Sequence, residues 1–175
     1  ISTTRKRQLY GYRRDNHKVG IRNELWIIVT VGCVNSIADN IIKNFKQQHS
    51  SLDIDGIYSF EHPYGCSQMG EDQEHTINIL KRMVQHPNAG GVLVLGLGCE
   101  NNQLKPFYES LNDIDPQRVR YLNCQDVNNE IEEACEILND IYEIMRHDKR
   151  EPISFHDITF GLKCGGSDGF SGITA

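Results

Sequence analysis

The sequence lacks a long hydrophobic run: it contains no stretch of about 18 apolar residues and no charged segment followed by an apolar leader. We therefore expect neither a membrane-spanning helix nor a secretory signal. A lysine- and arginine-rich stripe is also missing, since 18 basic residues face 24 acidic ones and the formal net charge is -6. Nucleic-acid backbones require clustered cations. These absences predict a cytoplasmic protein whose partners include neither membrane nor nucleic acid, while a small anionic ligand stays allowed.

Paired Cys-x-x-Cys motifs are missing among the six cysteines, which argues against a structural zinc ribbon. Their even number does not predict disulfides, because the expected compartment is reducing. Low-complexity sequence is absent, and a chain of 175 residues suffices for one domain. The chain begins at Ile1 without methionine and stops soon after a glycine-rich segment, so we interpret it as a piece of a longer polypeptide.

Five short apolar runs alternate with helix-like patterns, which predicts repeated strand-helix units and a parallel sheet. The runs span residues 25–31, 56–60, 91–97, 119–122 and 158–162. The first and third are richest in Val, Ile and Leu, as in central strands buried on both faces. Helical spacing of apolar residues predicts helices from Ser36 onward and over residues 73–84, 104–111 and 130–146. We therefore expect an α/β fold: an open, mainly parallel five-stranded sheet with helices on both faces, Rossmann-like or flavodoxin-like, in the order 2-1-3-4-5.

Gly-Cys pairs recur every 33 residues, at 32–33, 65–66 and 98–99, each after a predicted strand or in its loop. Ankyrin repeats share this period, but a strand in every unit and the lack of a Thr-Pro-Leu-His signature argue against a solenoid. We interpret 33 residues as one strand-helix unit.

Ligands of open parallel sheets bind outside the carboxyl ends of the strands, and five of the six cysteines are expected at that edge. These five are Cys33, Cys66, Cys99, Cys124 and Cys164. Each of them alone is as compatible with packing, because cysteine is among the most buried residue types. Their recurrence at successive strand ends favours a pocket lined by at least two of them. Cys135 belongs to a helix stripe, where we expect a small buried hydrophobe.

Other residues near the predicted strand ends offer weaker signals. His62 follows the second strand, where an imidazole serves as a metal ligand or proton shuttle. Arg22 and Asn23 lie close enough to the first strand to reach a carboxylate. Residues 96–101 carry the first two glycines of a dinucleotide fingerprint but not the third. The loop 163–169 has no Gly-Lys-Ser/Thr ending, and its amides are suited to an oxyanion or carboxylate.

Six blocks in order carry a resemblance to a known family. They are residues 11–14 with 19–23, 30–35, 62–68 (His-Pro-Tyr-Gly-Cys-Ser-Gln), 86–88, 96–103 (Gly-Leu-Gly-Cys-Glu-Asn-Asn-Gln), and 161–169 with 171–175. Together they resemble the altronate dehydratase and galactarate dehydratase family over nearly the whole chain from about Tyr10. Residues 24–27 and 148–152 are closer to the altronate branch of that family.

This resemblance implies a hydro-lyase of hexuronate breakdown that converts D-altronate to 2-dehydro-3-deoxy-D-gluconate with a divalent metal, iron(II) or alternatively manganese(II). It implies that residues 1–9 are a linker from a missing amino-terminal domain and residues 10–163 the α/β domain. Residues 164–175 are then the glycine-rich loop that begins a truncated carboxyl-terminal domain. The partners are a sugar acid and the remaining domains, the sequence allows a homo-oligomer, and the piece alone is expected to be inactive.

Dehydrating a 2,3-dihydroxy acid requires removal of the C2 proton, stabilisation of an ene-diolate and protonation of the departing C3 hydroxyl. With the resemblance in hand, the expected catalytic residues are His62, Glu100 and Asp168, and the expected metal ligands are Cys66, Cys99 and Cys164. The expected substrate-binding residues are Arg22, Asn23, Asn35, Gln68, Asn101, Asn102, Gly165, Gly166 and Ser167. For Glu100 the alternative is a helix-start carboxylate favoured by the helix dipole.

Three alternative functions stay open at this point. The segment can be a noncatalytic scaffold or assembly domain of the same enzyme, with the chemistry elsewhere. Its substrate can be galactarate instead of altronate. The doubly wound pattern also allows a nucleotide-binding domain.

Overall fold

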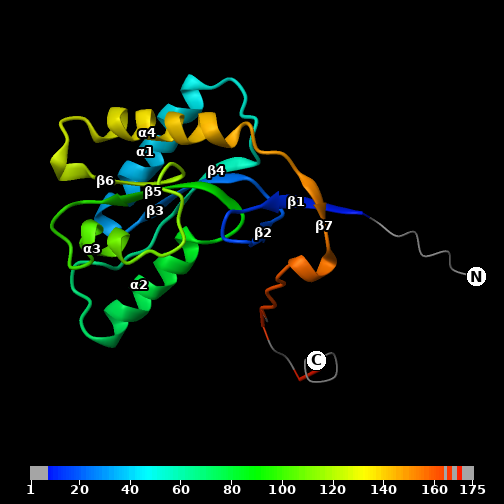
Figure 1. Cartoon of the computed structure of the whole chain (residues 1–175). Coiled ribbons are helices and arrows are strands. Elements are labelled where there is room, and N and C mark those ends of the chain that lie inside the picture. Colours follow the sequence, from blue (N-terminus) through cyan, green and yellow to red (C-terminus); the bar gives the residue numbers. More distant parts are fainter. Residues whose placement is uncertain (1–7, 164, 167–168, 171–175) are drawn as a thin grey trace, which may run out of the picture.

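The computed structural model describes residues 8–163, 165–166 and 169–170. Its parallel sheet has four strands, in the spatial order β4 (Gly56–Phe60), β3 (Glu24–Val29), β5 (Ala89–Gly96) and β6 (Val119–Asn123). Figure 1 shows this sheet between two layers of helices. Helices α1 (Asn35–Gln48) and α4 (Glu130–Met145) cover one face, and α2 (Glu71–Val84) and α3 (Leu104–Glu109) cover the other.

Strand β3 joins the two hydrophobic cores of the sandwich. All six of its residues are buried, and successive side chains point to opposite faces of the sheet. Leu25, Ile27 and Val29 therefore pack with α1 and α4, whereas Trp26 and Ile28 pack with α2 and α3. The prediction that the first and third apolar runs form central strands is confirmed, because β3 lies between β4 and β5, and β5 between β3 and β6.

Helix α4 packs tightly on β5 because a residue without a side chain lies beneath it. A Cβ atom at Gly91 would come 2.1 Å from Cγ2 of Ile141, so only glycine allows this approach. The helix begins where the Asn129 side chain accepts a hydrogen bond from the Glu132 N–H. Its apolar stripe, predicted from the sequence, is buried from Ala134 to Met145, and Ile131 at its start is partly buried.

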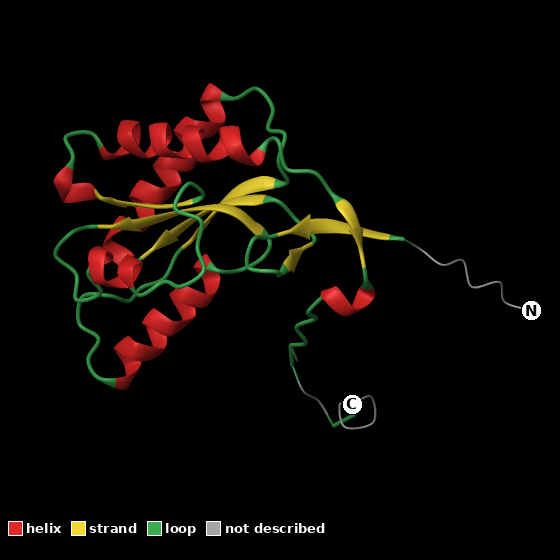
Figure 2. Ribbon diagram, in the orientation of Figure 1, coloured by secondary structure: helices red, strands yellow, loops and turns green. Residues whose placement is uncertain are grey.

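A second sheet, antiparallel and three-stranded, lies at the amino ends of the parallel strands (Figure 2). Its order is β2 (Val19–Gly20), β1 (Leu9–Arg13) and β7 (Glu151–Ile153). Gly20 touches the backbone before β5, where a Cβ atom would meet the Pro87 carbonyl oxygen at 2.1 Å. Strand β7 thus brings the chain back from α4 onto β1.

The prediction of one five-stranded sheet in the order 2-1-3-4-5 is wrong. Residues 158–162 form no strand; they follow the 3-10 turn η3 (Phe155–Asp157) as exposed coil, with Leu162 98% exposed. The parallel sheet therefore ends at β6. The physical reason is that α4 ends beside the amino edge, where β7 pairs antiparallel with β1 instead of adding to β6.

Within the part of the chain that the structure describes, no helix combines the length and the apolar character needed to cross a bilayer.

The close packing of α4 on β5 gives a test of the fold. Ile141→Ala is expected to lower the free energy of unfolding by about 2–5 kcal/mol, because the deletion leaves a cavity over Gly91. The matched control is Ile79→Ala on α2, where the side chain is 59% exposed. That change should stay within about 0.5 kcal/mol. Urea titration followed by circular dichroism measures both, and equal losses would contradict the packing described here.

Candidate functional site

Two thiols from different strand ends lie in contact at the carboxyl edge of the parallel sheet. Cys33 lies in the 3-10 turn η1 (Gly32–Val34) after β3, and Cys66 lies in the loop after β4. Their Sγ atoms are 3.8 Å apart, and both residues are exposed. The prediction that thiols distant in sequence meet at this edge is confirmed for this pair.

Cys99, after β5, is exposed at the same edge and acts electrostatically on Cys66. The pKa of the Cys66 thiol is raised, first by its hydrogen bond to Cys33, then by partial desolvation and by the neighbouring Cys33 and Cys99 charges. Cys124 belongs to the core, where burial raises its pKa to about 11. Cys135 is the small buried hydrophobe that the sequence predicts.

His62 ties the loop after β4 to the end of β3. Its Nδ1 accepts a hydrogen bond from the Tyr64 N–H at 3.2 Å, and its Nε2–H donates to the Val29 carbonyl at 2.9 Å. The Gly32 N–H donates to the Tyr64 carbonyl at 2.8 Å. His62 is an expected catalytic residue, but both of its ring nitrogens are hydrogen-bonded to the backbone. These two hydrogen bonds position the loops that carry Cys33 and Cys66 against each other.

The same loop requires glycine at position 65. Its φ of +125° lies in the left-handed region, and a Cβ atom there would come 2.8 Å from the Thr30 carbonyl oxygen. The Gly-Cys repeat thus has a steric cause at this position: the glycine lets the loop approach the end of β3, and the following cysteine then faces Cys33.

Glu100, the second expected catalytic residue, points inward. Only 2% of it is exposed, and its carboxylate accepts hydrogen bonds from Thr30 Oγ1 at 2.7 Å, the Leu97 N–H at 3.1 Å and the Gly98 N–H at 2.6 Å. It precedes α3 by four positions, so it is not the helix-start carboxylate either. In this arrangement Glu100 fixes the turn that presents Cys99.

Amide side chains gather at the carboxyl edge, as the sequence predicts for Asn35, Gln68, Asn101 and Asn102. Asn35 donates from Nδ2 to the His62 carbonyl at 3.1 Å, and Asn101 donates to the Gln68 carbonyl at 3.3 Å. Across the residues described, three buried side-chain atoms have no hydrogen-bond partner: Asn35 Oδ1, Asn102 Nδ2 and Asn123 Oδ1. A buried polar atom without a partner is unfavourable, so these three positions are left unsatisfied by the described residues.

A hollow of about 660 Å³ opens beside the thiol pair. Cys33, Cys66, Ser67, Gln68 and Asp72 supply its polar wall, and Val31, Pro63, Tyr64 and Met69 supply most of its apolar wall. A cavity of this size is sufficient for a small organic acid.

Arg22 and Asn23, expected to bind substrate, lie at the opposite edge of the sheet. Asn23 is buried and donates from Nδ2 to the Met145 carbonyl at 3.1 Å. The Arg22 guanidinium donates to the Glu24 carboxylate and, at 3.0 Å, to the Asp55 carbonyl. Both residues precede β3, and a parallel strand begins at the amino edge. Hence they brace that edge and are not brought together with the thiols.

The two described glycines expected to bind substrate, Gly165 and Gly166, also do not join the thiol edge. Gly165 and Gly166 are exposed, with nothing within 4 Å of a Cβ atom built on either. They follow β7, which Figure 1 shows on the side of the molecule away from the carboxyl ends of the strands. The other three residues expected from this segment, Cys164, Ser167 and Asp168, lie outside the described residues.

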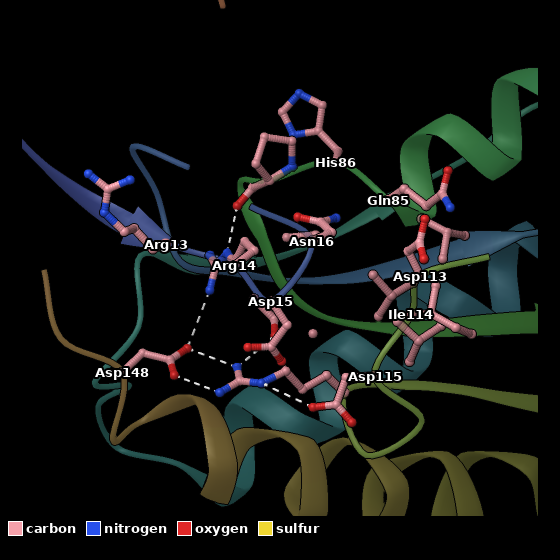
Figure 3. Close-up of a pocket in the computed structure, with 18 residues that line it drawn as sticks. Arg13, Arg14, Asp15, Asn16, Gln85, His86, Asp113, Ile114, Asp115 and Asp148 are labelled. Atoms are coloured by element: carbon pink, nitrogen blue, oxygen red, sulfur yellow. Dashed lines mark hydrogen bonds and ion pairs between the residues drawn. The ribbon is translucent and has the colours of Figure 1, made fainter. Parts of the chain in front are cut away.

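A second cavity, of about 120 Å³, lies at the amino edge and is shown in Figure 3. Its polar wall is an ion-pair network in which Arg118 holds both oxygens of Asp148, at 2.7 and 2.9 Å. Arg14 reaches the same carboxylate at 3.4 Å and donates to the Pro87 carbonyl at 2.8 Å. Burial lowers the pKa of Arg14, which the Asp148 charge opposes. Because these charges satisfy one another, we assign this cavity a role in joining β1, β5 and α4.

Sequence reasoning missed two residues of the carboxyl edge. Cys33 was left outside the expected metal ligands, although it opens the 33-residue repeat that includes Cys66 and Cys99. Thr30 was not singled out, and only the fold reveals its hydrogen bond to Glu100.

The donors at this edge bear on the predicted divalent metal. Thiols suit iron and zinc better than magnesium or calcium. Among the residues that can be described, no group of three or more His, Cys, Asp or Glu side chains is arranged to hold an ion. The Cys33 and Cys66 thiols are in contact, but no third donor from the described residues forms a metal-binding group with them.

Comparison with known proteins gives a consistent result. Residues 11–146 match the family model described as D-galactarate dehydratase/Altronate hydrolase, second domain. Over 170 residues, 97% of the chain, it is 55% identical to altronate dehydratase of Escherichia coli (strain K12) and 50% identical to altronate dehydratase of Bacillus subtilis (strain 168). It is 28% identical over 178 residues, 94% of the chain, to galactarate dehydratase (L-threo-forming) of Escherichia coli (strain K12). The chain spans about a third of these relatives, 34% of the length of each.

The inward position of Glu100 leads to a stability prediction. Glu100→Gln is expected to destabilise the fold by about 1–3 kcal/mol, because an amide presents a donor where the turn supplies donors. Glu109→Gln, at an exposed position at the end of α3, is the matched control and should change stability by about 0.5 kcal/mol or less. Urea unfolding curves measure both, and an unchanged midpoint for Glu100→Gln would contradict the hydrogen bonds given above.

The environments of the thiols predict their order of alkylation. At about pH 8, Cys33 and Cys99 should be alkylated by iodoacetamide first and Cys66 more slowly, because its raised pKa leaves less thiolate. Cys124 and Cys135 should stay unlabelled until the protein unfolds, since burial both shields them and raises their pKa. Peptide mass spectrometry over a time course gives each rate. Early labelling of Cys124 in the folded protein would contradict its place in the core.

Proposed function

The chain belongs to the D-galactarate dehydratase/altronate hydrolase family, and from this we propose that it is the middle α/β domain of a hydro-lyase that dehydrates D-altronate to 2-dehydro-3-deoxy-D-gluconate. The observation that carries the proposal is identity of 55% and 50% to two altronate dehydratases across 97% of the chain, against 28% to a galactarate dehydratase. Altronate is therefore the favoured substrate over galactarate.

The carboxyl edge is the part of the substrate site that this domain supplies in our proposal. A sugar acid carries several hydroxyls, and the amide atoms of Asn35, Asn102 and Asn123 that lack partners can accept from or donate to them. Gln68 and Asn101 lie beside the thiols and complete the polar rim. In this role the asparagines hold the substrate hydroxyls in a fixed orientation, which lowers the entropic part of the barrier.

The described residues of this domain supply orientation more readily than proton transfer. His62 and Glu100 are engaged by backbone groups, so we propose them as positioning residues for the loops that carry Cys66 and Cys99. The acid and base then come from Asp168 or from the part of the longer enzyme that this chain does not contain.

Cys66 and Cys99 are proposed as ligands of the divalent metal, iron(II) or manganese(II), together with Cys164. When bound, such an ion stabilises the negative charge that develops on the substrate carboxylate. The hollow beside the thiols is open, so it leaves room for the sugar acid.

Exposed apolar side chains support the proposal that residues from 164 onward lead into a further domain and residues 1–9 come from a preceding one. Phe155, Phe160 and Leu162 are 65%, 62% and 98% exposed, a surface suited to cover by another part of a longer cytoplasmic polypeptide. Relatives about three times as long provide such a part. Activity is accordingly proposed for the longer protein and not for this piece alone.

A chimaera tests the function directly. Placing this chain in the Escherichia coli altronate dehydratase, in place of the 170 residues that it matches, should give an enzyme that dehydrates D-altronate with added iron(II) and prefers it to galactarate. Cys66→Ser and Cys99→Ser in the chimaera should each lower kcat/KM by at least about tenfold, since loss of even an outer-shell metal partner has that effect. Formation of the 2-keto product, followed by its semicarbazone absorbance, is the measurement.

The control for the chimaera is Cys135→Ala in α4, which removes a thiol far from the edge and should leave kcat/KM near that of the parent. Full turnover in both serine variants would favour the scaffold interpretation, in which this domain only assembles the enzyme. A chimaera that prefers galactarate would refute the proposed substrate.

A further inference from the structure

The thiols of Cys33 and Cys66 are in contact without being bonded. Their Sγ atoms are 3.8 Å apart, and both cysteines are free. A disulfide brings its two sulfur atoms to about 2.0 Å, so the pair has about 1.8 Å left to close. Rotation of the two side chains covers such a gap where the backbones that carry them are already close.

The backbones of the two cysteine loops meet at the glycine that precedes each cysteine. A Cβ atom at Gly32 would come 2.7 Å from the His62 carbonyl oxygen, and one at Gly65 would come 2.8 Å from the Thr30 carbonyl oxygen. Each loop thus packs its glycine against the backbone of the other strand end. The Gly32 N–H also donates to the Tyr64 carbonyl at 2.8 Å, which ties the loops together. A bond between the following cysteines therefore requires no rearrangement of the sheet.

A small oxidant reaches both sulfur atoms from solvent. Cys33 and Cys66 are exposed, and both line the open hollow of about 660 Å³. Cys124 and Cys135, by contrast, are buried in the core. Thiols that sense oxidants are characteristically exposed and adjacent to a second thiol that resolves the first oxidation product. Exposed disulfides are also the ones that reductants reopen, which makes them reversible.

We propose that Cys33 and Cys66 form a reversible oxidation site, which hydrogen peroxide closes to a disulfide and a dithiol reopens. One sulfur attacks the peroxide O–O bond and becomes a sulfenic acid, with release of one water. The second sulfur then displaces the sulfenic hydroxyl, which leaves as another water while the S–S bond forms. The two thiols lose two electrons and two protons in total. The dithiol returns them by exchange through a mixed disulfide and is itself oxidised to a disulfide.

Closing this bond is expected to stop the reaction of the longer enzyme. Cys66 is one of the proposed metal ligands, and the thiolate is the form of cysteine that binds a metal. A sulfur atom held in a disulfide is no longer a thiolate. This consequence rests on the proposed function, whereas formation of the bond does not. Cys33, which lies outside the proposed ligands, gains a role as the partner that makes oxidation of Cys66 reversible.

Peptide mapping tests the bond. The 175-residue chain is reduced, freed of reductant, treated with hydrogen peroxide in the presence of a chelator and quenched with iodoacetamide. Mass spectrometry under non-reducing conditions should then find the peptides of Cys33 and Cys66 linked, with the loss of two hydrogens, and dithiothreitol should release them. Cys33→Ser and Cys66→Ser should each remove the linked peptide. Cys99→Ser, at the same edge, is the matched control and should keep it at the parental yield.

Far-UV circular dichroism checks that every variant is folded, and a parallel sample in urea shows whether the bond depends on the fold. The proposal is overturned if the folded parent gives no linked peptide, or if the link needs urea to form. It is equally overturned if Cys66 links to Cys99 in the parent while Cys33 stays free for alkylation.

The chimaera separates this proposal from the proposed function. It is oxidised without metal, freed of peroxide, and assayed with D-altronate after iron(II) is added. Turnover should fall in step with the yield of the linked peptide and return after dithiothreitol. A chimaera that is inactive even when reduced would refute the proposed reaction and leave the disulfide standing. An active chimaera in which Cys33 and Cys66 do not link would refute the disulfide and leave the reaction standing. Full turnover with the bond formed would refute Cys66 as a metal ligand.

Discussion

The hydrogen bond from the His62 ring to the Val29 carbonyl is the interaction on which the carboxyl edge depends. Where a parallel ladder ends, backbone groups lose their partners and must be satisfied by something else. His62 satisfies the end of β3, and Glu100 satisfies two N–H groups in the turn after β5. Both side chains are therefore engaged in hydrogen bonds that hold the loops, and the exposed thiols of Cys33, Cys66 and Cys99 are left as nucleophilic groups at this edge.

The two edges of the parallel sheet consequently have different roles. At the amino edge, Arg118 and Asp148 form a bidentate pair in which both side chains are at most 23% exposed, and Arg14 joins them. Removing one member of such a group leaves a charge without compensation, so the network constrains how β1 and α4 sit on the sheet. At the carboxyl edge, by contrast, polar atoms are left without partners. The ion pairs at the amino edge thus satisfy one another, whereas three amide atoms at the carboxyl edge have no partner among the described residues.

Sequence patterns predicted the helices and strands that depend on the spacing of apolar residues. They failed for strands whose formation depends on pairing with a distant segment. Four parallel strands and the four helices follow from apolar spacing, which each segment carries by itself. The run 158–162 has the composition of a strand but does not pair with the outer edge of β6, because β7 leads the chain from α4 to β1 at the amino edge. Strands β1, β2 and β7 are short, and β1 and β7 each include a charged residue, so nothing in their composition indicated strands.

The candidate site shows the same difference between what sequence spacing predicts and what depends on contacts in the fold. The 33-residue spacing of Gly-Cys predicted a common edge, since it follows from the length of one strand-helix unit. It did not predict which thiol would face Cys66, because that depends on the loop geometry around Gly65. Arg22 and Asn23 were misplaced for a simpler reason: nearness to a strand in sequence does not distinguish its two ends. The inward turn of Glu100 depends on backbone donors that no residue pattern encodes.

The partnerless amide atoms also bear on whether this domain binds substrate or only assembles the enzyme. Each buried polar atom without a hydrogen bond destabilises a fold by about 1–3 kcal/mol, and a pure scaffold gains nothing from keeping three of them at one edge. A binding site gains from them, because a ligand that brings the missing partners recovers that free energy on association. Asn35 joins the two features, since its Nδ2 helps to fix the His62 loop and its Oδ1 is buried without a partner. Asn35 therefore connects the hydrogen bond that holds the His62 loop with the substrate contact that we propose for this edge.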